Sequence, residues 1–161
     1  MKESNTMIND LVLESDSHLI KEIQPYERVA KYYETDQMAV IHHSNYIRWF
    51  EEARVDYLEQ IGLGYGTIEA AGIYSPVLGI TCEYKSAVRF NEKVIINAEL
   101  VFFNGIKMKL KYTVLDGESK QVRVTGTSDH CFVTTDFKPI SLKKAQPKMY
   151  EILLGCVNKV H

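Results

Sequence analysis

Long apolar runs and a strong excess of one charge are both absent from this sequence of 161 residues. No stretch approaches the ~18 apolar residues that a membrane-spanning helix needs, and the N-terminal residues are polar, unlike those of a secretion signal. The net charge of −2 gives no general attraction to nucleic acid or to anionic membranes. We therefore expect a cytoplasmic protein with no membrane span and no nucleic-acid partner.

Cysteine is also scarce in this chain. Its three cysteines, Cys82, Cys131 and Cys156, form no pair or Cys/His cluster with metal-ligand spacing. Phosphate-binding glycine loops, a G-x-S-x-G nucleophile motif and a His pair four residues apart are missing as well. These absences favour reduced thiols, and we expect neither a metal nor a cofactor.

What the chain does contain is typical of one globular domain. Apolar residues make up 45% and charged residues 25% of the sequence, and the length allows a substantial buried core. Residues 1–22 are polar with only short apolar interludes, and we interpret them as an N-terminal extension. The remaining residues, 23–161, are expected to form a single domain that includes a C-terminal helix.

The clearest secondary-structure signal is a helix over residues 44–61. Apolar side chains recur there at spacings of three and four, from Tyr46 to Ile61. Ser44 is a candidate N-cap, and Gly62 is a candidate terminator.

Most of the other signals are strands. Every second residue from Met108 to Val114 is apolar, and Asn104-Gly105 is typical of a tight hairpin turn. The expected elements in chain order are strand 25–33, helix 44–61, a short helical piece 67–71, a strand beginning near Tyr74, strands 94–101, 107–114 and 121–135, and a helix 143–154 that is broken near Pro147. This order predicts an α+β architecture, in which a long helix packs on one face of a curved antiparallel sheet of about five strands. The four strands after the helix are expected to form a meander.

The most informative stretch precedes the long helix. Residues 36–46 read Asp-Gln-Met-Ala-Val-Ile-His-His-Ser-Asn-Tyr, so a carboxylate lies just upstream of a helix N-terminus. Unpaired backbone N–H groups and the positive end of the helix dipole favour a developing negative charge at that place. A carboxylate beside an oxyanion site is the minimum equipment for attack on an activated acyl group. From the residues alone, the alternative that Asp36 only caps a turn stays open.

Residues 35–46, followed by Trp-Phe-Glu-Glu-Ala-Arg at 49–54, resemble the signature of the hot-dog-fold acyl-CoA thioesterases, in the 4-hydroxybenzoyl-CoA thioesterase and YbgC-like family. That signature reads roughly T-D-x-x-G-V-V-Y-H-x-x-Y and continues into a helix that ends in E-x-A-R. Residues 81–90 resemble a second segment of the family. Two departures are Ala39, where the family has Gly, and His42, where it more often has Tyr.

The resemblance implies a hot-dog fold and hydrolysis of an acyl-CoA thioester to the free acid and CoA. It implies that Asp36 attacks the thioester carbonyl or activates a water, and that His43 orients the thioester or the water. The backbone N–H groups of His43 and Ser44 would hold the oxyanion. CoA is then part of the substrate rather than a cofactor.

Substrate contacts are assigned from position along the chain. The apolar candidates for the acyl pocket are Tyr46, Phe50, Tyr74, Pro76 and Val77. Core packing alone would also explain each of them. In the second matching segment, the candidates for binding the phosphates of CoA are Lys85 and Arg89.

Two other functions stay open at this point. One is a thioesterase that acts on acyl carrier protein thioesters instead of CoA thioesters. The other is a non-catalytic acyl-CoA-binding module, which would be indifferent to replacement of Asp36 by Asn. In each case a lone unit leaves a sheet edge uncovered, so we expect a homodimer or a homotetramer.

Overall fold

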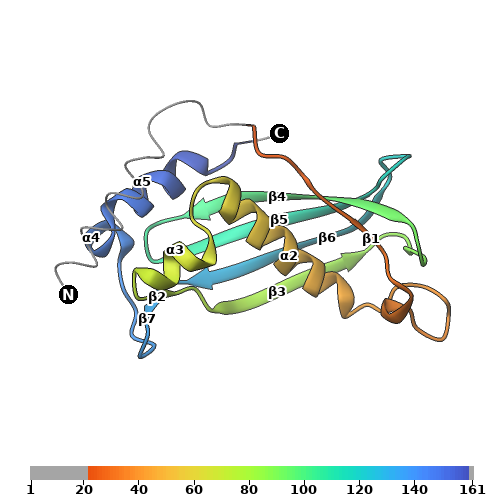
Figure 1. Cartoon of the computed structure of the whole chain (residues 1–161), viewed down its shortest axis with the longest axis horizontal. Coiled ribbons are helices and arrows are strands. Elements are labelled where there is room, and N and C mark those ends of the chain that lie inside the picture. The colour runs from red at the N-terminus through yellow and green to blue at the C-terminus, as the bar shows by residue number, and fades with distance from the viewer. Residues whose placement is uncertain (1–21, 160–161) are drawn as a thin grey trace.

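A five-stranded antiparallel sheet carries a long helix on one face in the computed structural model, which describes residues 22–159 (Figure 1). The strands are β1 (Tyr26–Val29), β2 (Ile73–Tyr74), β3 (Val77–Tyr84), β4 (Lys93–Phe103), β5 (Lys107–Asp116), β6 (Val122–Cys131) and β7 (Val133–Thr134). The helices are the 3-10 turn η1 (Tyr32–Glu34), α2 (Asn45–Gln60), α3 (Tyr65–Ala70), α4 (Leu142–Ala145) and α5 (Pro147–Cys156). The order of strands across the sheet is β1-β4-β5-β6-β3.

Helix α2 packs on the sheet through the apolar face that its residue spacing creates. Phe50 stacks on Tyr112 of β5, with the ring centroids 4.5 Å apart and the ring planes 6° apart. Gly126 of β6 permits this contact, because a Cβ at residue 126 would overlap the Phe50 ring and the Thr81 carbonyl. The side chains of α2 buried in this way are Tyr46, Trp49, Phe50, Ala53, Arg54, Tyr57 and Leu58.

The main features of the architecture agree with the sequence prediction. The long helix begins and ends within one residue of the expected bounds, and the alternating apolar residues of β5, from Met108 to Val114, are all buried in the core. The C-terminal helix is broken as expected, because α4 ends at Ala145 and α5 starts with Pro147. Proline suits the first position of a helix, where no backbone N–H is needed.

Three sequence predictions about the strands are wrong. Strands β4, β5 and β6 form a meander, but β3 lies at the far edge of the sheet and pairs with β6 instead of β4. The strand expected over 25–33 ends at Val29, because the chain turns into η1. The strand expected over 121–135 is divided at Phe132, so that β6 stays in the main sheet and β7 pairs with β2.

Residues 1–21 of the expected N-terminal extension lie outside the described residues. Within residues 22–159, no helix is both long enough and apolar enough to cross a membrane.

Candidate active site

Asp36 lies in a short loop between η1 and α2, at the opposite end of the molecule from α4 and α5 (Figure 1). The Asp36 N–H donates to the Val40 carbonyl at 2.8 Å, and one carboxylate oxygen of Asp36 accepts from the Met38 N–H at 2.8 Å. Ala39 completes the loop with a φ of 61°, in the left-handed region that favours glycine. Among the described residues the Asp36 carboxylate forms no ion pair, so its second oxygen is available for chemistry.

Glu34 anchors this loop from a buried position two residues before Asp36. Its carboxylate accepts two hydrogen bonds from the Arg28 guanidinium, both at 2.9 Å. It also accepts from the Trp49 indole N–H at 2.7 Å and from the Lys31 backbone N–H at 2.9 Å. Strand β1, the turn η1 and helix α2 therefore meet at one carboxylate.

The backbone carbonyl of Glu34 holds the start of α2. It accepts from the His42 N–H at 2.9 Å and from the Asn45 side-chain amide at 2.8 Å. Both ends of the Asp36 loop are thus tied to Glu34. Glu34 had no signal of burial in the sequence, because a single glutamate beside Thr35 and Asp36 is typical of an exposed loop.

The residues at the helix start have distinct environments. Ser44 occupies the N-cap position, but its hydroxyl contacts His42 Nδ1 at 2.7 Å and makes no capping bond to the backbone. The Ser44 N–H donates to the same His42 nitrogen at 3.2 Å. The His43 side chain is exposed, and its carbonyl accepts from the Tyr84 hydroxyl at 3.0 Å. No hydrogen bond among the described residues uses the His43 backbone N–H.

Tyr46 is part of the core and lines neither of the cavities described below. Its ring packs edge-on against Trp49 and Tyr84, at centroid distances of 4.9 and 5.6 Å. Its hydroxyl accepts from the Val88 N–H at 3.4 Å, and burial raises its pKa. Tyr46 therefore supports the site by packing α2 against the sheet.

The other four apolar candidates line two adjacent cavities. The inner cavity, of about 120 Å³, lies between α2 and the sheet and is lined by Ile47, Phe50, Glu51, Arg54, Val77, Ile80, Tyr112, Ser128 and His130. The outer cavity, of about 230 Å³, is lined by Arg54, Leu58, Tyr65, Ile68, Glu69, Ile73, Tyr74, Ser75, Pro76 and Phe137. Phe50 and Val77 thus line the inner cavity, whereas Tyr74 and Pro76 line the outer one.

A buried polar chain, which had no recognisable signal in the sequence, lines the inner cavity and reaches the outer one at Arg54. Arg54 donates to His130 Nδ1 at 2.8 Å, and His130 Nε2 lies 2.7 Å from the Ser128 hydroxyl. The Ser128 hydroxyl is 2.7 Å from that of Tyr112. Burial, together with the charge of Arg54, lowers the pKa of His130 to about 4, so the imidazole is neutral at ordinary pH.

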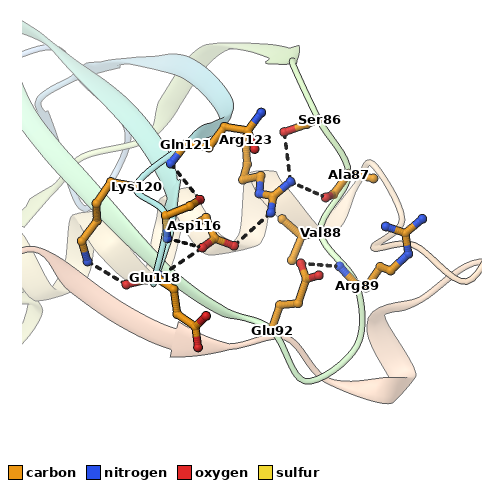
Figure 2. Close-up of polar contacts among 12 residues, drawn as sticks. Ser86, Ala87, Val88, Arg89, Glu92, Asp116, Glu118, Lys120, Gln121 and Arg123 are labelled. Atoms are coloured by element: carbon orange, nitrogen blue, oxygen red, sulfur yellow. Dashed lines mark hydrogen bonds and ion pairs between the residues drawn. The ribbon is translucent and has the colours of Figure 1, made fainter.

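The connection from β3 to β4 is held by Arg123 (Figure 2). Its guanidinium donates to the Asp116 carboxylate at 2.9 Å, and to the Ser86 hydroxyl and the Ala87 carbonyl at 3.3 Å each. The backbone N–H of Ser119, together with Arg123, holds the pKa of Asp116 well below its usual range. Asp116 and Arg123 therefore form a fixed ion pair beneath this connection.

The same connection supports the Asp36 loop. The Ile41 N–H donates to the Val88 carbonyl at 2.8 Å, and Val40 lies opposite Arg89 in an isolated β-bridge. The second matching segment of the sequence is therefore packed directly against the first.

The two candidate CoA-binding cations have different surroundings. Lys85 pairs with Glu83 at 2.9 Å on the exposed edge of the sheet. Arg89 forms no ion pair within residues 22–159, and Figure 2 shows its guanidinium directed away from the Asp116–Arg123 pair. No group of three or more His, Cys, Asp or Glu side chains in the described part of the chain is arranged to hold a metal ion. The absence of a cofactor stays a prediction.

Comparison with known proteins gives the family. The sequence profile of the thioesterase-like superfamily matches residues 31–149, which run from η1 into α5 and include the Asp36 loop. The chain belongs to the thioesterase-like superfamily. This membership confirms the resemblance at residues 35–46 and the expected class of enzyme, a thioester hydrolase.

Several members of the superfamily are similar along most of their length. The crystal structure of the DHNA-CoA thioesterase from Staphylococcus aureus has a TM-score of 0.78 and 34% sequence identity, covering 82% of this chain and 89% of that one. YneP of Bacillus subtilis (strain 168), provisionally named an acyl-CoA thioesterase, is 32% identical over 118 residues, which are 73% of this chain and 85% of YneP. The acyl-CoA thioester hydrolase YbgC of Escherichia coli O157:H7 is 24% identical over 118 residues, which are 73% of this chain and 88% of YbgC. These similarities confirm the predicted hot-dog fold of the thioesterases.

Proposed function

We propose that this protein hydrolyses acyl-CoA thioesters to the free acid and CoA, with Asp36 as the reacting carboxylate. The observation that carries the proposal is the placement of Asp36. Its carboxylate is held at one oxygen by the Met38 N–H, in a loop that leads directly into α2, and it has no ion-pair partner among residues 22–159. The names of the DHNA-CoA thioesterase and of YbgC support CoA thioesters as the substrate class.

In the proposed reaction the thioester carbonyl lies at the start of α2. Asp36 either attacks the carbonyl carbon, giving an anhydride that water then opens, or removes a proton from a water that attacks the same carbon. In both routes the carbonyl oxygen becomes an oxyanion, and its collapse breaks the carbon–sulfur bond and releases the CoA thiolate. The thiolate takes its proton from Asp36 in the water route and from solvent in the anhydride route. His43, which is exposed beside this place, is proposed to orient the thioester or the water.

The oxyanion is proposed to accept from the backbone N–H of His43, assisted by the dipole of α2. This N–H makes no hydrogen bond in the described part of the chain, so it needs no rearrangement. The Ser44 N–H, the second expected donor, would first have to release His42 Nδ1. A single oxyanion donor is typically worth ~3 kcal/mol of transition-state stabilisation, so the position of His43 matters to the rate.

The acyl group is proposed to enter the inner cavity, past Phe50 and Val77, with Tyr74 and Pro76 beyond them around the outer cavity. Arg89 is the proposed partner of a CoA phosphate, because it lies beside the Asp36 loop and its guanidinium forms no ion pair in the described part of the chain, although its backbone N–H donates to the Glu92 carboxylate at 3.0 Å. Lys85 is expected to contribute less, because Glu83 already neutralises its charge.

The test is hydrolysis of a panel of acyl-CoA thioesters by the wild type, by Asp36→Asn and by the control Asp56→Asn. Asp56 is on α2, where it accepts from the Gln60 amide away from the proposed site. We expect Asp36→Asn to lose roughly 10²–10⁴-fold in kcat, and Asp56→Asn to match the wild type. Full turnover by Asp36→Asn would exclude its role. Cleavage of carrier-protein thioesters alone, or binding without turnover, would establish one of the two other functions.

We also propose a homodimer that forms through β3. The outer edge of β3 has no strand partner among the described residues, and Val77 and Leu78 are 49% and 54% exposed there. Such an edge favours pairing with a second strand. Light scattering is expected to give the mass of a dimer, and Leu78→Lys to shift it toward the monomer; a wild-type monomer would contradict the proposal. A homotetramer and the cytoplasmic location stay predictions.

A further inference from the structure

Arg54 is a buried cation without a close carboxylate. Its side chain is 5% exposed, and its two hydrogen bonds in the described structure go to His130 Nδ1 at 2.8 Å and to the Tyr65 hydroxyl at 2.7 Å. The acceptors are thus an imidazole nitrogen and a phenol oxygen. Its one ion pair among residues 22–159 is with Glu51, at 4.0 Å, and the Glu51 side chain is 66% exposed.

Within residues 22–159, the charge of Arg54 is balanced only by the exposed Glu51 carboxylate at 4.0 Å and by the Tyr65 ring, whose centroid lies 5.9 Å from the guanidinium carbon. A guanidinium has five N–H donors, and only two of those of Arg54 are engaged in the bonds above. His130 cannot supply negative charge, and burial, together with the charge of Arg54, lowers its pKa. Burying a cation without an anion is costly, so the site favours a ligand that brings the negative charge.

Arg54 is also the residue that the two cavities share. It lines the inner cavity together with Phe50, and it lines the outer cavity together with Ser75. The Ser75 hydroxyl is buried and has no hydrogen-bond partner in the described structure. A second unused donor therefore lies in the wall of the same cavity as the guanidinium.

The position along α2 relates this cation to the reactive end of the site. Ile47, near the helix start, lines the same inner cavity as Arg54. Eleven positions separate Arg54 from His43, the proposed oxyanion donor, which is roughly 16 Å at the α-helical rise, and the arginine side chain shortens this span because helical side chains lean toward the helix N-terminus. An acyl group whose carbonyl lies at the start of α2 and whose chain follows the inner cavity would end at Arg54.

We propose that Arg54, assisted by Ser75, binds a carboxylate at the far end of the acyl group, so that the preferred substrates are CoA thioesters of dicarboxylic acids. This inference rests on the proposed thioesterase function and specifies its substrate class. A carboxylate would accept two N–H groups of the guanidinium in the fork geometry that arginine favours, and the Ser75 hydroxyl would donate to the same group.

The test compares suberoyl-CoA with octanoyl-CoA. The two acyl chains have the same length, but suberoyl ends in a carboxylate and octanoyl ends in a methyl group. A hydrogen-bonded charge pair of this kind predicts a kcat/KM for suberoyl-CoA that is roughly tenfold or more above that for octanoyl-CoA in the wild type. Arg54→Met is expected to abolish or reverse this preference, and Arg54→Lys to keep part of it. The matched control is Arg48→Met, an exposed arginine on the same helix that lines a separate open groove, and it is expected to keep the wild-type ratio.

Each outcome decides the inference separately from the proposed function. If the wild type shows no preference for suberoyl-CoA, or if Arg54→Met retains the preference, the proposed carboxylate site is wrong. The proposed thioester hydrolysis would be unaffected by either result. If Arg54→Met does not fold, Ser75→Ala supplies the same comparison, with a severalfold drop in the ratio expected and an unchanged ratio counting against the site. Calorimetry of free suberate against octanoate, on Asp36→Asn, tests the site without turnover: tighter binding of suberate is expected, and equal binding would contradict it.

Discussion

The carboxylate of Glu34 accepts a hydrogen bond of 2.7 Å from the indole of Trp49, and the same indole lies under the guanidinium of Arg28 at 4.6 Å. Because Arg28 also forms a bidentate pair with Glu34, the three side chains satisfy one another in a place with little access to water. Asp36 follows two residues later, so the proposed reacting carboxylate is positioned by a structural one.

Replacement of Glu34 by Gln is expected to destabilise the protein strongly. It leaves the Arg28 side chain, which is 10% exposed, with Glu52 at 3.5 Å as its remaining ion-pair partner in the described part of the chain. Breaking a buried pair in this way costs roughly 3–5 kcal/mol in free energy of unfolding. Urea denaturation measures the effect. Glu52→Gln, whose carboxylate is 41% exposed, serves as the control and should cost less than about 1 kcal/mol; equal losses in the two variants would contradict the role of Glu34.

Ala39→Gly is expected to stabilise the protein. A left-handed conformation costs an L-residue about 1–2 kcal/mol, and Ala39 adopts it with a φ of 61°. The greater freedom of glycine in the unfolded chain removes part of the gain, which leaves roughly 0.5–1 kcal/mol. The midpoint of urea unfolding should rise accordingly, and a lower midpoint would show that the Ala39 methyl group makes a contact that matters.

Stability is expected to fall between pH 6.5 and pH 4 because of His130. Burial and Arg54 lower its pKa from 6.5 to about 4 in the folded protein, so the unfolded chain binds more protons across this range. The free energy of unfolding therefore decreases as the pH falls, with a total loss on the order of 3 kcal/mol. His130→Gln keeps a donor and an acceptor but does not titrate. Urea unfolding at a series of pH values should show a shallower slope for this variant, and identical slopes would contradict the assignment.

Arg89→Ala is expected to raise KM for acyl-CoA thioesters roughly threefold to tenfold without changing kcat, because a lost phosphate contact weakens ground-state and transition-state binding equally. The corresponding acyl-N-acetylcysteamine thioester lacks the CoA phosphates, and its kinetics should not change. Lys85→Ala, with its charge already paired to Glu83, should have the smaller effect. Equal losses on both thioesters would instead indicate that Arg89 supports the Asp36 loop.

The parts of the fold that the sequence predicted are those with a local periodic signal. The spacing in α2, the alternation in β5 and the break at Pro147 each depend on neighbours within a few residues. The position of β3 does not depend on such near neighbours. This edge strand is exposed on both faces, and it pairs with a strand far along the chain, for example through Thr81 and Thr127. The pattern of apolar and polar residues in β3 therefore could not predict at which edge of the sheet the strand lies.

The candidate site could be proposed from the sequence only where a motif indicated it. The motif indicated Asp36, His43 and the helix start, but it gave no information on which N–H groups are free, and in the structure the Ser44 N–H donates to His42 Nδ1. The buried polar residues gave no signal either. Arg54 and His130 lie 76 positions apart in the chain, and a charged residue on a helix reads as a solvent-exposed one until its partners are known.

The bonds of Glu34 also bear on how the domain is completed. Its side chain needs Arg28 from the first strand, and its carbonyl needs the first turn of the long helix, so neither element alone can shape the Asp36 loop. A chain released or refolded with either element undocked would present the same sequence motif without its geometry. The loop conformation therefore exists only in the fully folded domain. In a nascent or partly folded chain, Asp36 would be present without the geometry that positions its carboxylate.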